Sequence, residues 1–341
     1  MNINVFSPTY HQSMSYGRLA NELVDGLRTR GVHVNTLGLD MQGSRQRIRP
    51  SMGGFLLAIP PVYKQYGPFA RGGVRIAVTM LETTRIPRDW VEVLNNCTAV
   101  IVPAAFMIET FRASGVRAPI HVVPLGVSDV FKAPRRRQYS KPFTVLVIGD
   151  RGTRKNWWDG ALAFHDAFGD DPRFRLIIKS HAMPHGITNP NIDIIEANYS
   201  DEEMRDLYCR AHVMLFPARG EGFGFPPREF AATGGVAIAT NWSGTAGGLR
   251  FWGVPLPVYD FEPGYTEEPD LMADGAVWAV PRRGDMVRKL REVARNYSQY
   301  ADFAMDAAHF VDRAYRWQRF SDDCLAIYTH YLEEAYDRHV G

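Results

Sequence analysis

Two glutamates stand eight positions apart in a stretch that alternates flexible and rigid backbone. The segment reads RGEGFGFPPREFAATGG over residues 219–235, with Glu221 and Glu229 as its carboxylates and Gly222 and Gly224 between them. Glycine lets backbone N–H groups approach a ligand closely, and a helix that starts behind such a loop favours an anion. Carboxylates beside the anion can accept hydrogen bonds from hydroxyl groups. Such a site suits a nucleotide sugar, in which phosphate groups are flanked by two hydroxyl-bearing rings.

The neighbouring residues predict that this segment joins a strand to a helix. Residues 212–218 (HVMLFPA) form an apolar run typical of a buried strand, and residues 228–234 begin a helix. Pro226 and Pro227 suit the first helical turn, where the backbone N–H that proline lacks has no partner within the helix. The loop is therefore expected at the carboxyl end of a sheet.

Strands and helices alternate along the first part of the chain. The expected strands are 3–8, 32–38, 74–80, 99–104 and 120–126, and the expected helices are 18–31 and 107–115. Leu19, Leu23 and Leu27 recur on one helical face, and Gly31 follows as a C-terminal cap. A strand, a helix and another strand in this order are the seed of a parallel sheet.

The alternation restarts after a polar, proline-flanked segment, KAPRRRQYSKP (132–142), which reads as an interdomain linker. Behind it we expect strands at 143–150, 174–180, 191–197, 212–218 and 236–240, and helices at 157–169, 201–211 and 285–296. The predicted fold class is α/β, with two doubly wound Rossmann-like domains in tandem. Ligands of such sheets lie beyond the carboxyl ends of the strands, so the cleft between the domains is the expected site.

Length and composition fit two ordinary globular domains. The chain has 341 residues, of which 45% are hydrophobic and 22% charged. Its three cysteines are far apart and form no C-x-x-C motif, which fits a reducing cytoplasm better than a disulfide framework. The N-terminus lacks the basic and apolar regions of a signal peptide, and the longest apolar run (53–63) is too short to span a bilayer. The expected location is cytoplasmic.

The two-glutamate segment resembles the signature of the retaining family-4 glycosyltransferases of the GT-B fold. The shared pattern is a glutamate, then G-F-G-apolar-P, then a second glutamate eight positions after the first. Most of the chain is similar to the family, except about 40–70 and 255–280. The further matching segments are 149–164 (GDRGTRKNWWDGALAF), 80–90, 123–131, 242–247 and 315–332. The resemblance implies transfer of a hexose or similar sugar from a UDP- or GDP-sugar to an acceptor hydroxyl, with retention of configuration.

The resemblance also implies roles for individual residues. Glu229 would bind the nucleotide ribose, and Glu221 would contact the transferred sugar. Lys155 would hold the diphosphate and stabilise it as it leaves. The backbone N–H groups that would cradle sugar and diphosphate belong to Gly222, Phe223, Gly224 and Phe225. With arginine, lysine and a helix N-terminus supplying positive charge, we expect neither a metal ion nor any other cofactor.

Two departures from the family pattern leave assignments open. Many members carry arginine directly after the first glycine of the 149–164 segment, but this chain has Asp150, so the diphosphate arginine is either Arg151 or Arg154. Many members place a histidine near the transferred sugar, whereas the matching front-domain segment reads TMLETT, which puts Glu82 at that place.

The family's arrangement implies a division of labour along the chain. Residues 1–135 would form the acceptor domain and 143–312 the donor domain, joined by a linker at 136–142, with a helix at 313–341 that crosses back to the acceptor domain. The residues expected to face the phosphates and the acceptor are Ser15, Tyr16, Gly17 and Arg85.

Charge is distributed unevenly between the two halves. Residues 1–140 carry 17 Lys and Arg against 8 Asp and Glu, a net charge of +9, and the rest of the chain carries 22 against 29, a net charge of −7. Fifteen of the 17 cations are arginine, which binds phosphate through paired hydrogen bonds. The expected acceptor is therefore anionic. Two kinds of anionic acceptor stay open: DNA with a hydroxymethylated base flipped from the duplex, or a phosphate-bearing lipid or lipopolysaccharide at a membrane surface. A neutral glycan or a protein acceptor also stays open.

Two other functions compete with sugar transfer. A GT-B-like protein that binds nucleotide sugars without catalysis is one, although the presence of Lys155, Glu221 and Glu229 argues against lost catalysis. A nucleotide-sugar epimerase is the other, and it would need acid and base carboxylates that the sequence does not identify.

Overall fold

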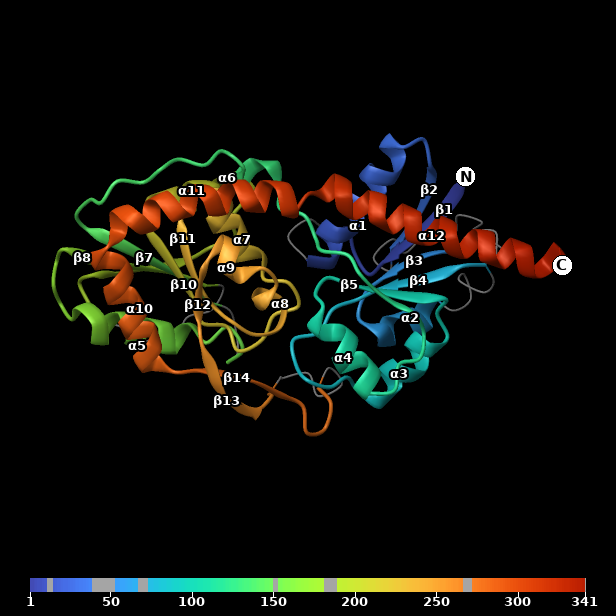
Figure 1. Cartoon of the computed structure of the whole chain (residues 1–341), viewed down its shortest axis with the longest axis horizontal. Helices are drawn as coiled ribbons and strands as arrows, with labels where there is room; N and C mark the ends of the chain where they lie inside the picture. The colour runs from blue at the N-terminus through green and yellow to red at the C-terminus, as the bar shows by residue number, and fades with distance from the viewer. Residues whose placement is uncertain are drawn as a thin grey trace. The chain divides into compact units, whose positions relative to one another are not determined.

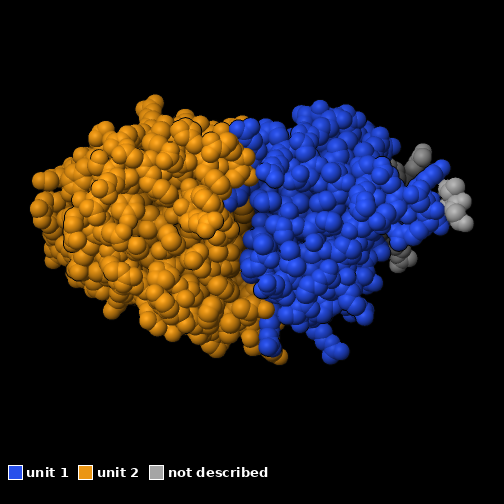
Figure 2. All heavy atoms as spheres, viewed as in Figure 1, with its two compact units in different colours: residues 1–81, 85–126, 315–341 blue, residues 82–84, 127–314 orange. Residues whose placement is uncertain are grey.

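The structure is a computed structural model that describes residues 1–10, 15–38, 53–66, 73–149, 153–180, 189–265 and 272–340 (Figure 1). The chain divides into two units, coloured separately in Figure 2. Unit 1 comprises residues 1–81, 85–126 and 315–341, and unit 2 comprises residues 82–84 and 127–314.

Unit 1 is built on a six-stranded parallel sheet in the order β2-β1-β3-β4-β5-β6. The strands are β1 (Asn2–Ser7), β2 (His33–Gly38), β3 (Gly54–Leu57), β4 (Arg75–Val78), β5 (Ala99–Val102) and β6 (Ile120–Val122). The chain passes from β1 to β2 on one side and then crosses to β3 on the other. The topological switch point therefore lies between β1 and β3.

The helices of unit 1 come from both ends of the chain. They are α1 (Ser15–Thr29), α2 (Pro60–Tyr66), α3 (Arg88–Asn95), α4 (Phe106–Ala113) and α12 (Trp317–Val340). The leucine stripe predicted for α1 is buried, because Leu19, Leu23 and Leu27 each expose 1% or less of their surface. Helix α1 packs against α12, where Ser321 Oγ donates to the carbonyl of Glu22 at 3.2 Å. The last helix of the chain thus completes the first unit.

Unit 2 repeats the plan with the order β12-β11-β10-β7-β8-β9, again parallel throughout. Its sheet contains β7 (Phe143–Ile148), β8 (Phe174–Ser180), β9 (Ile192–Glu196), β10 (Val213–Phe216), β11 (Val236–Thr240) and β12 (Val254–Leu256). Alternate residues of β7, Phe143, Val145 and Val147, are fully buried in one cluster with Phe164 and Leu290. Burying each large apolar side chain contributes about 1.5–3 kcal/mol.

Helices and a separate hairpin surround this second sheet. The helices are η1 (Asp129–Phe131), α5 (Trp157–Phe168), α6 (Asp201–Arg210), α7 (Phe225–Ala232), α8 (Ser243–Ala246), α9 (Leu249–Trp252), α10 (Arg283–Arg295) and α11 (Tyr297–Ala314). Strands β13 (Val258–Pro263) and β14 (Val277–Pro281) pair in antiparallel fashion. In the described part of the chain, no helix combines the length and apolarity needed to cross a membrane.

The predicted class, α/β with two doubly wound parallel sheets, is confirmed. Strands β3 and β12 and the β13–β14 hairpin were not predicted. Helix α1 starts at Ser15, three residues before the expected start at 18. The segment 132–142, read as a linker, packs on unit 2: half-buried Arg137 donates to Thr233 Oγ1 at 2.6 Å, and Arg136 pairs with Asp302 at 2.6 Å.

Candidate active site

The topology of unit 2 singles out one edge of its sheet. From β7 the chain runs outward to β8 and β9 and then returns to β10 on the other side of β7. Strands β7 and β10 are direct neighbours, with Val145 opposite Val213. The segments that follow these two strands therefore lie at the switch point where doubly wound sheets bind ligands. Their described residues are 149, 153–156 and 217–224.

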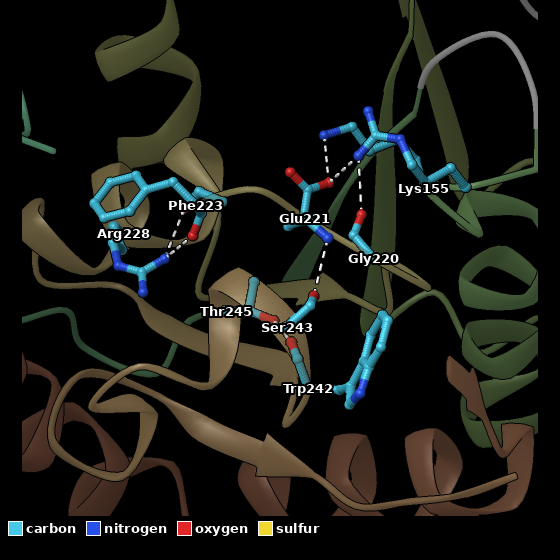
Figure 3. Close-up of polar contacts among 10 residues, drawn as sticks. Lys155, Gly220, Glu221, Phe223, Arg228, Trp242, Ser243 and Thr245 are labelled. Carbon is cyan, nitrogen blue, oxygen red and sulfur yellow. Dashed lines mark hydrogen bonds and ion pairs between the residues drawn. The ribbon is translucent and has the colours of Figure 1, made fainter. Parts of the chain in front are cut away.

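These two loops bring two cations onto one carboxylate. Lys155 Nζ donates to Glu221 Oε1 at 2.6 Å (Figure 3). Arg154 Nη1 donates to the same oxygen at 2.9 Å. Arg154 Nη1 also binds the carbonyl of Gly220 at 2.9 Å. The side chains of Glu221, Lys155 and Arg154 are 9%, 13% and 32% exposed. The cluster thus carries a net positive charge at a largely buried place.

The pKa of the Glu221 carboxyl shows which force dominates in this cluster. Burial pushes the pKa upward, but the charges and hydrogen bonds of Lys155 and Arg154 together outweigh burial and hold the pKa below its ordinary value. Glu221 is therefore ionised at neutral pH. Because its folded pKa is lowered, the stability it contributes is complete above the unfolded pKa and is lost as the pH falls through the folded value.

Arg219 fixes the loop that carries both cations. Its backbone N–H donates to the carbonyl of Arg154 at 2.8 Å, and its own carbonyl accepts from Ala279 on β14 at 2.9 Å. The Arg219 side chain donates to Asn156 Oδ1 at 3.2 Å and pairs with Glu262 of the hairpin. Asn156, just before α5, has a positive φ of 50°, a conformation that few residues other than glycine adopt. Such strain persists where surrounding contacts impose it.

The backbone of Glu221 is held from the opposite side by the segment after β11. Glu221 N–H donates to Ser243 Oγ at 3.0 Å, and Gly244 N–H donates to the Glu221 carbonyl at 2.8 Å. Ser243 itself has a φ of 55°. The segment after β7 and the segment after β11 therefore each contain a non-glycine residue with positive φ beside the cluster, Asn156 and Ser243. Such residues are common at functional sites.

Glu82 lies next to this cluster through its backbone. A Cβ added at Gly220 would come within 1.9 Å of the Glu82 carbonyl oxygen, so only glycine fits at 220. Residues 82–84 belong to unit 2, and Thr84 exchanges two hydrogen bonds with Val277 at 3.2 and 3.0 Å. The role expected for the Glu82 side chain stays a prediction.

Glu229 is oriented by a neighbouring helix. It lies on α7 and is 6% exposed, and Tyr208 on α6 donates its hydroxyl to Glu229 Oε2 at 3.1 Å. The fully buried Tyr208 ring packs edge-to-face on Phe230, with centroids 5.7 Å apart. Both predicted glutamates are thus buried and held by hydrogen bonds from unit 2.

The glycine-rich turn between the glutamates is closely packed. Gly222, Phe223 and Gly224 are buried, and Phe225 is half-buried. Gly224 has a φ of 83°, and a Cβ there would lie 2.7 Å from Thr245 Cγ2, so both conformation and space require glycine. Because Pro226 and Pro227 carry no N–H, donors toward a ligand must come from the turn rather than from the next two residues of α7.

The remaining predicted residues lie elsewhere or outside the described residues. Ser15, Tyr16 and Gly17 form the first turn of α1 in unit 1, after β1 of its switch point. Tyr16 Oη lies 3.3 Å from Thr79 Oγ1 and accepts from the N–H of Met80 at 3.3 Å. Arg85 is exposed and belongs to unit 1. Arg151 lies outside the described residues, so the structure shows Arg154 in the cluster and leaves Arg151 as a prediction.

Sequence reasoning missed the side chains that position the predicted ones. Ser243, Tyr208, Arg219 and Arg228 all touch the loops or the glutamates described above. Arg228 had a visible signal, because a cation stands next to Glu229 in a helix whose other residues are apolar or proline. Tyr208 had none, because contacts between helices α6 and α7 depend on the tertiary fold.

The comparison with solved structures agrees with this architecture, whereas the comparisons of sequence found no match. No family model and no curated protein sequence matches the chain significantly. Among solved structures, sucrose-phosphate synthase from Thermosynechococcus elongatus is similar, with a TM-score of 0.71, 12% identity, and coverage of 97% of this chain and 98% of that chain. Anabaena HepE, solved with UDP and glucose, has a TM-score of 0.67 at 11% identity, covering 97% and 100%.

A third similar structure is an alpha,alpha-trehalose-phosphate synthase (UDP-forming) from Burkholderia vietnamiensis. Its TM-score is 0.63 at 10% identity, with 96% of this chain and 99% of that chain covered. At such low identities the likeness concerns the fold. The chain has two Rossmann-like units of the GT-B fold. The structural similarity to these proteins covers nearly the whole length of the chain.

Proposed function

We propose that the protein is a nucleotide-sugar-dependent glycosyltransferase. The observation that carries the proposal is the cluster of Lys155, Arg154 and Glu221 at the β7–β10 switch point. Two cations at that place suit the diphosphate of a nucleotide sugar, and the adjoining carboxylate suits sugar hydroxyls. The likeness in fold to structures such as HepE with UDP and glucose supports the same reading.

In this proposal the diphosphate of the donor replaces Glu221 as the counter-charge of Lys155 and Arg154. Glu221 neutralises part of the charge of Lys155 and Arg154 in the structure. A bound diphosphate takes over that role, and Glu221 turns to accept hydrogen bonds from the transferred sugar. The cations then stabilise the charge that develops on the diphosphate as the glycosidic bond breaks.

Retention of configuration is part of the proposal and rests on the resemblance to family 4. Glu221 and Glu229 are both engaged by hydrogen bonds, which suits binding of hydroxyls better than attack on the sugar. The leaving phosphate oxygen would accept the proton of the acceptor hydroxyl on the same face of the sugar. The protein then contributes mainly positioning and charge stabilisation.

A thermal-shift screen of UDP- and GDP-sugars tests donor binding. A ligand present at 100 times its dissociation constant stabilises the folded state by about 2.7 kcal/mol, which is readily measured. We expect at least one nucleotide sugar to raise the melting temperature, and the matching nucleoside to do so much less. If all nucleotide sugars leave the melting temperature unchanged, the proposal is wrong.

We further propose that transfer needs no metal ion. Arg154 and Lys155 supply the positive charge that a cation would otherwise bring to the diphosphate. Turnover should therefore persist in excess EDTA at a rate close to that of the untreated protein. Activity that EDTA abolishes and manganese restores would contradict this.

The net charge differs between the two units of the structure, and this difference bears on the acceptor. Unit 1 carries 16 Lys and Arg against 11 Asp and Glu, a net charge of +5, and unit 2 carries 23 against 26, a net charge of −3. The contrast between the halves is thus smaller than +9 against −7, because α12 is acidic and the arginines at 135–137 belong to unit 2. Unit 1 nevertheless stays basic, and we propose an anionic acceptor.

Salt dependence separates the two kinds of acceptor. Binding to hydroxymethylated duplex DNA should weaken steeply between 50 and 200 mM salt, on the order of 10³-fold if about six phosphates are contacted. Binding to anionic liposomes or lipopolysaccharide instead would favour a lipid-linked acceptor and a cytoplasmic protein at the membrane surface. Binding to neither at low salt would exclude an anionic polymer or membrane as acceptor.

A further inference from the structure

Arg228 is a cation buried beneath the glycine-rich turn. It lies on α7 next to Glu229 and is 1% exposed. Its guanidinium lies over two aromatic rings, 4.2 Å from the centroid of Phe223 and 4.5 Å from that of Trp252. In Figure 3 it lies on the far side of the Phe223 turn from Lys155. Neither the cluster of Lys155 and Glu221 nor the proposed chemistry uses this side chain.

The guanidinium joins the two loops that hold Glu221. Nη1 donates to the carbonyls of Phe223 and Gly224, the latter at 3.3 Å. Nη2 donates to the carbonyls of Gly244 at 2.9 Å and Gly247 at 3.3 Å. One planar group thus binds four carbonyls, two from the turn after β10 and two from the segment after β11. Arginine's rigid fork of donors suits such a bridge, and lysine's single ammonium does not.

The geometry of the peptide bond determines where the N–H groups next to these four carbonyls point. In a planar trans peptide the carbonyl of one residue and the N–H of the next point in opposite directions, and the only cis bond in the described chain is Lys141–Pro142. Carbonyls that face Arg228 therefore turn the following N–H groups away from it. The groups so directed are those of Gly224, Phe225, Thr245 and Gly248.

We infer that Arg228 is a positioning residue, which directs the N–H groups of both loops toward the diphosphate of the donor. This inference rests on the proposed function. With Pro226 and Pro227 unable to donate, the turn has to supply the N–H groups near the start of α7. Arg228 sets their direction from behind, while Lys155 and Arg154 supply charge from the β7 loop.

The test compares diphosphate and monophosphate binding by titration calorimetry, using the nucleoside identified by the donor screen. Arg228→Leu should weaken the affinity for the nucleoside diphosphate about 10- to 100-fold, as expected for lost hydrogen bonds to a charged group. The affinity for the nucleoside monophosphate should fall much less. Turnover should show a raised KM for the donor with a smaller change in kcat.

Arg137→Leu is the matched control. Arg137 is half-buried in unit 2, donates to the carbonyl of Ala211 and lies 4.7 Å from the ring centroid of Phe230 on α7, but it contacts the other end of that helix. Its loss should lower stability without changing the ratio of diphosphate to monophosphate affinity. Equal ratios in wild type and Arg228→Leu would overturn the inference.

Arg228→Lys keeps the charge and covers the case in which the leucine variant does not fold. It should lose most of the diphosphate affinity, because one ammonium cannot bridge both loops. If the lysine variant binds the diphosphate as tightly as wild type, charge rather than bridging matters and the inference is wrong. If wild type binds no nucleoside diphosphate at all, the proposed function itself fails, so the two failures are distinguishable.

Discussion

Replacing Lys155 with alanine should remove most sugar transfer while unit 2 stays folded. Loss of a charged partner to a buried anion costs about 2–5 kcal/mol, which corresponds to a roughly 30- to several-thousand-fold slower reaction. The fold should survive because Glu221 keeps its second cation, Arg154, at 2.9 Å. Steady-state kinetics with the identified donor, together with circular dichroism, measure both effects.

Lys289→Ala is the control for this variant. Lys289 is also a lysine of unit 2 and pairs with Glu292 at 2.9 Å, but it lies on α10 and its side chain is 23% exposed. Partly exposed pairs at the surface contribute about 0–1 kcal/mol, and Lys289 lies outside the Lys155 cluster, so the control should retain nearly full activity. Similar turnover in Lys155→Ala and Lys289→Ala would exclude Lys155 from the site.

Replacing Glu221 with glutamine should slow turnover without weakening the binding of the nucleoside diphosphate. The carboxylate competes with the diphosphate for Lys155 and Arg154, so its removal should leave nucleoside diphosphate affinity unchanged or tighter. Transfer should nevertheless fall about 10- to 150-fold, because the sugar loses hydrogen bonds to a charged group worth about 1.5–3 kcal/mol. Lys155→Ala, in contrast, should weaken both.

The same variant should also be less stable in the absence of ligand. Lys155 and Arg154 lose the carboxylate between them, at a cost of roughly 1–4 kcal/mol, reduced because Arg154 is about a third exposed. A nucleoside diphosphate should then raise the melting temperature of Glu221→Gln at least as much as that of wild type. A variant that binds the diphosphate more weakly than wild type would show that Glu221 does not compete with the ligand.

The sequence was informative where it contains clear apolar runs. Continuous apolar runs such as 143–148 and 236–240 predict buried parallel strands, and the structure has β7 and β11 there. The loop between β10 and α7 could be placed because glycine and proline mark its ends. From these elements alone, Glu221 was expected beyond the carboxyl end of a strand, where the structure has it.

Other features depend on contacts that a linear pattern does not contain. Strand β3 is four residues long and follows a stretch without clear periodicity. In β13 the aromatic residues Tyr259 and Phe261 are exposed, so the strand lacks the buried apolar face that marks a strand in a sequence. The meeting of Lys155 with Glu221 joins residues 66 positions apart and depends on β7 lying beside β10. Arg137 looked like part of a solvated linker, because its burial against Phe230 depends on how 132–142 packs on unit 2.

Release of nucleoside diphosphate from the donor most directly tests whether the protein is a nucleotide-sugar-dependent transferase. The donor that gives the largest thermal shift is incubated with wild type and with Lys155→Ala, without acceptor, and the free nucleoside diphosphate is quantified over time. We expect slow release by wild type, through transfer of the sugar to water, and at least a roughly 30-fold slower release by the variant. Tight donor binding by wild type with no release above the rate of the variant would instead indicate a binding protein without catalysis.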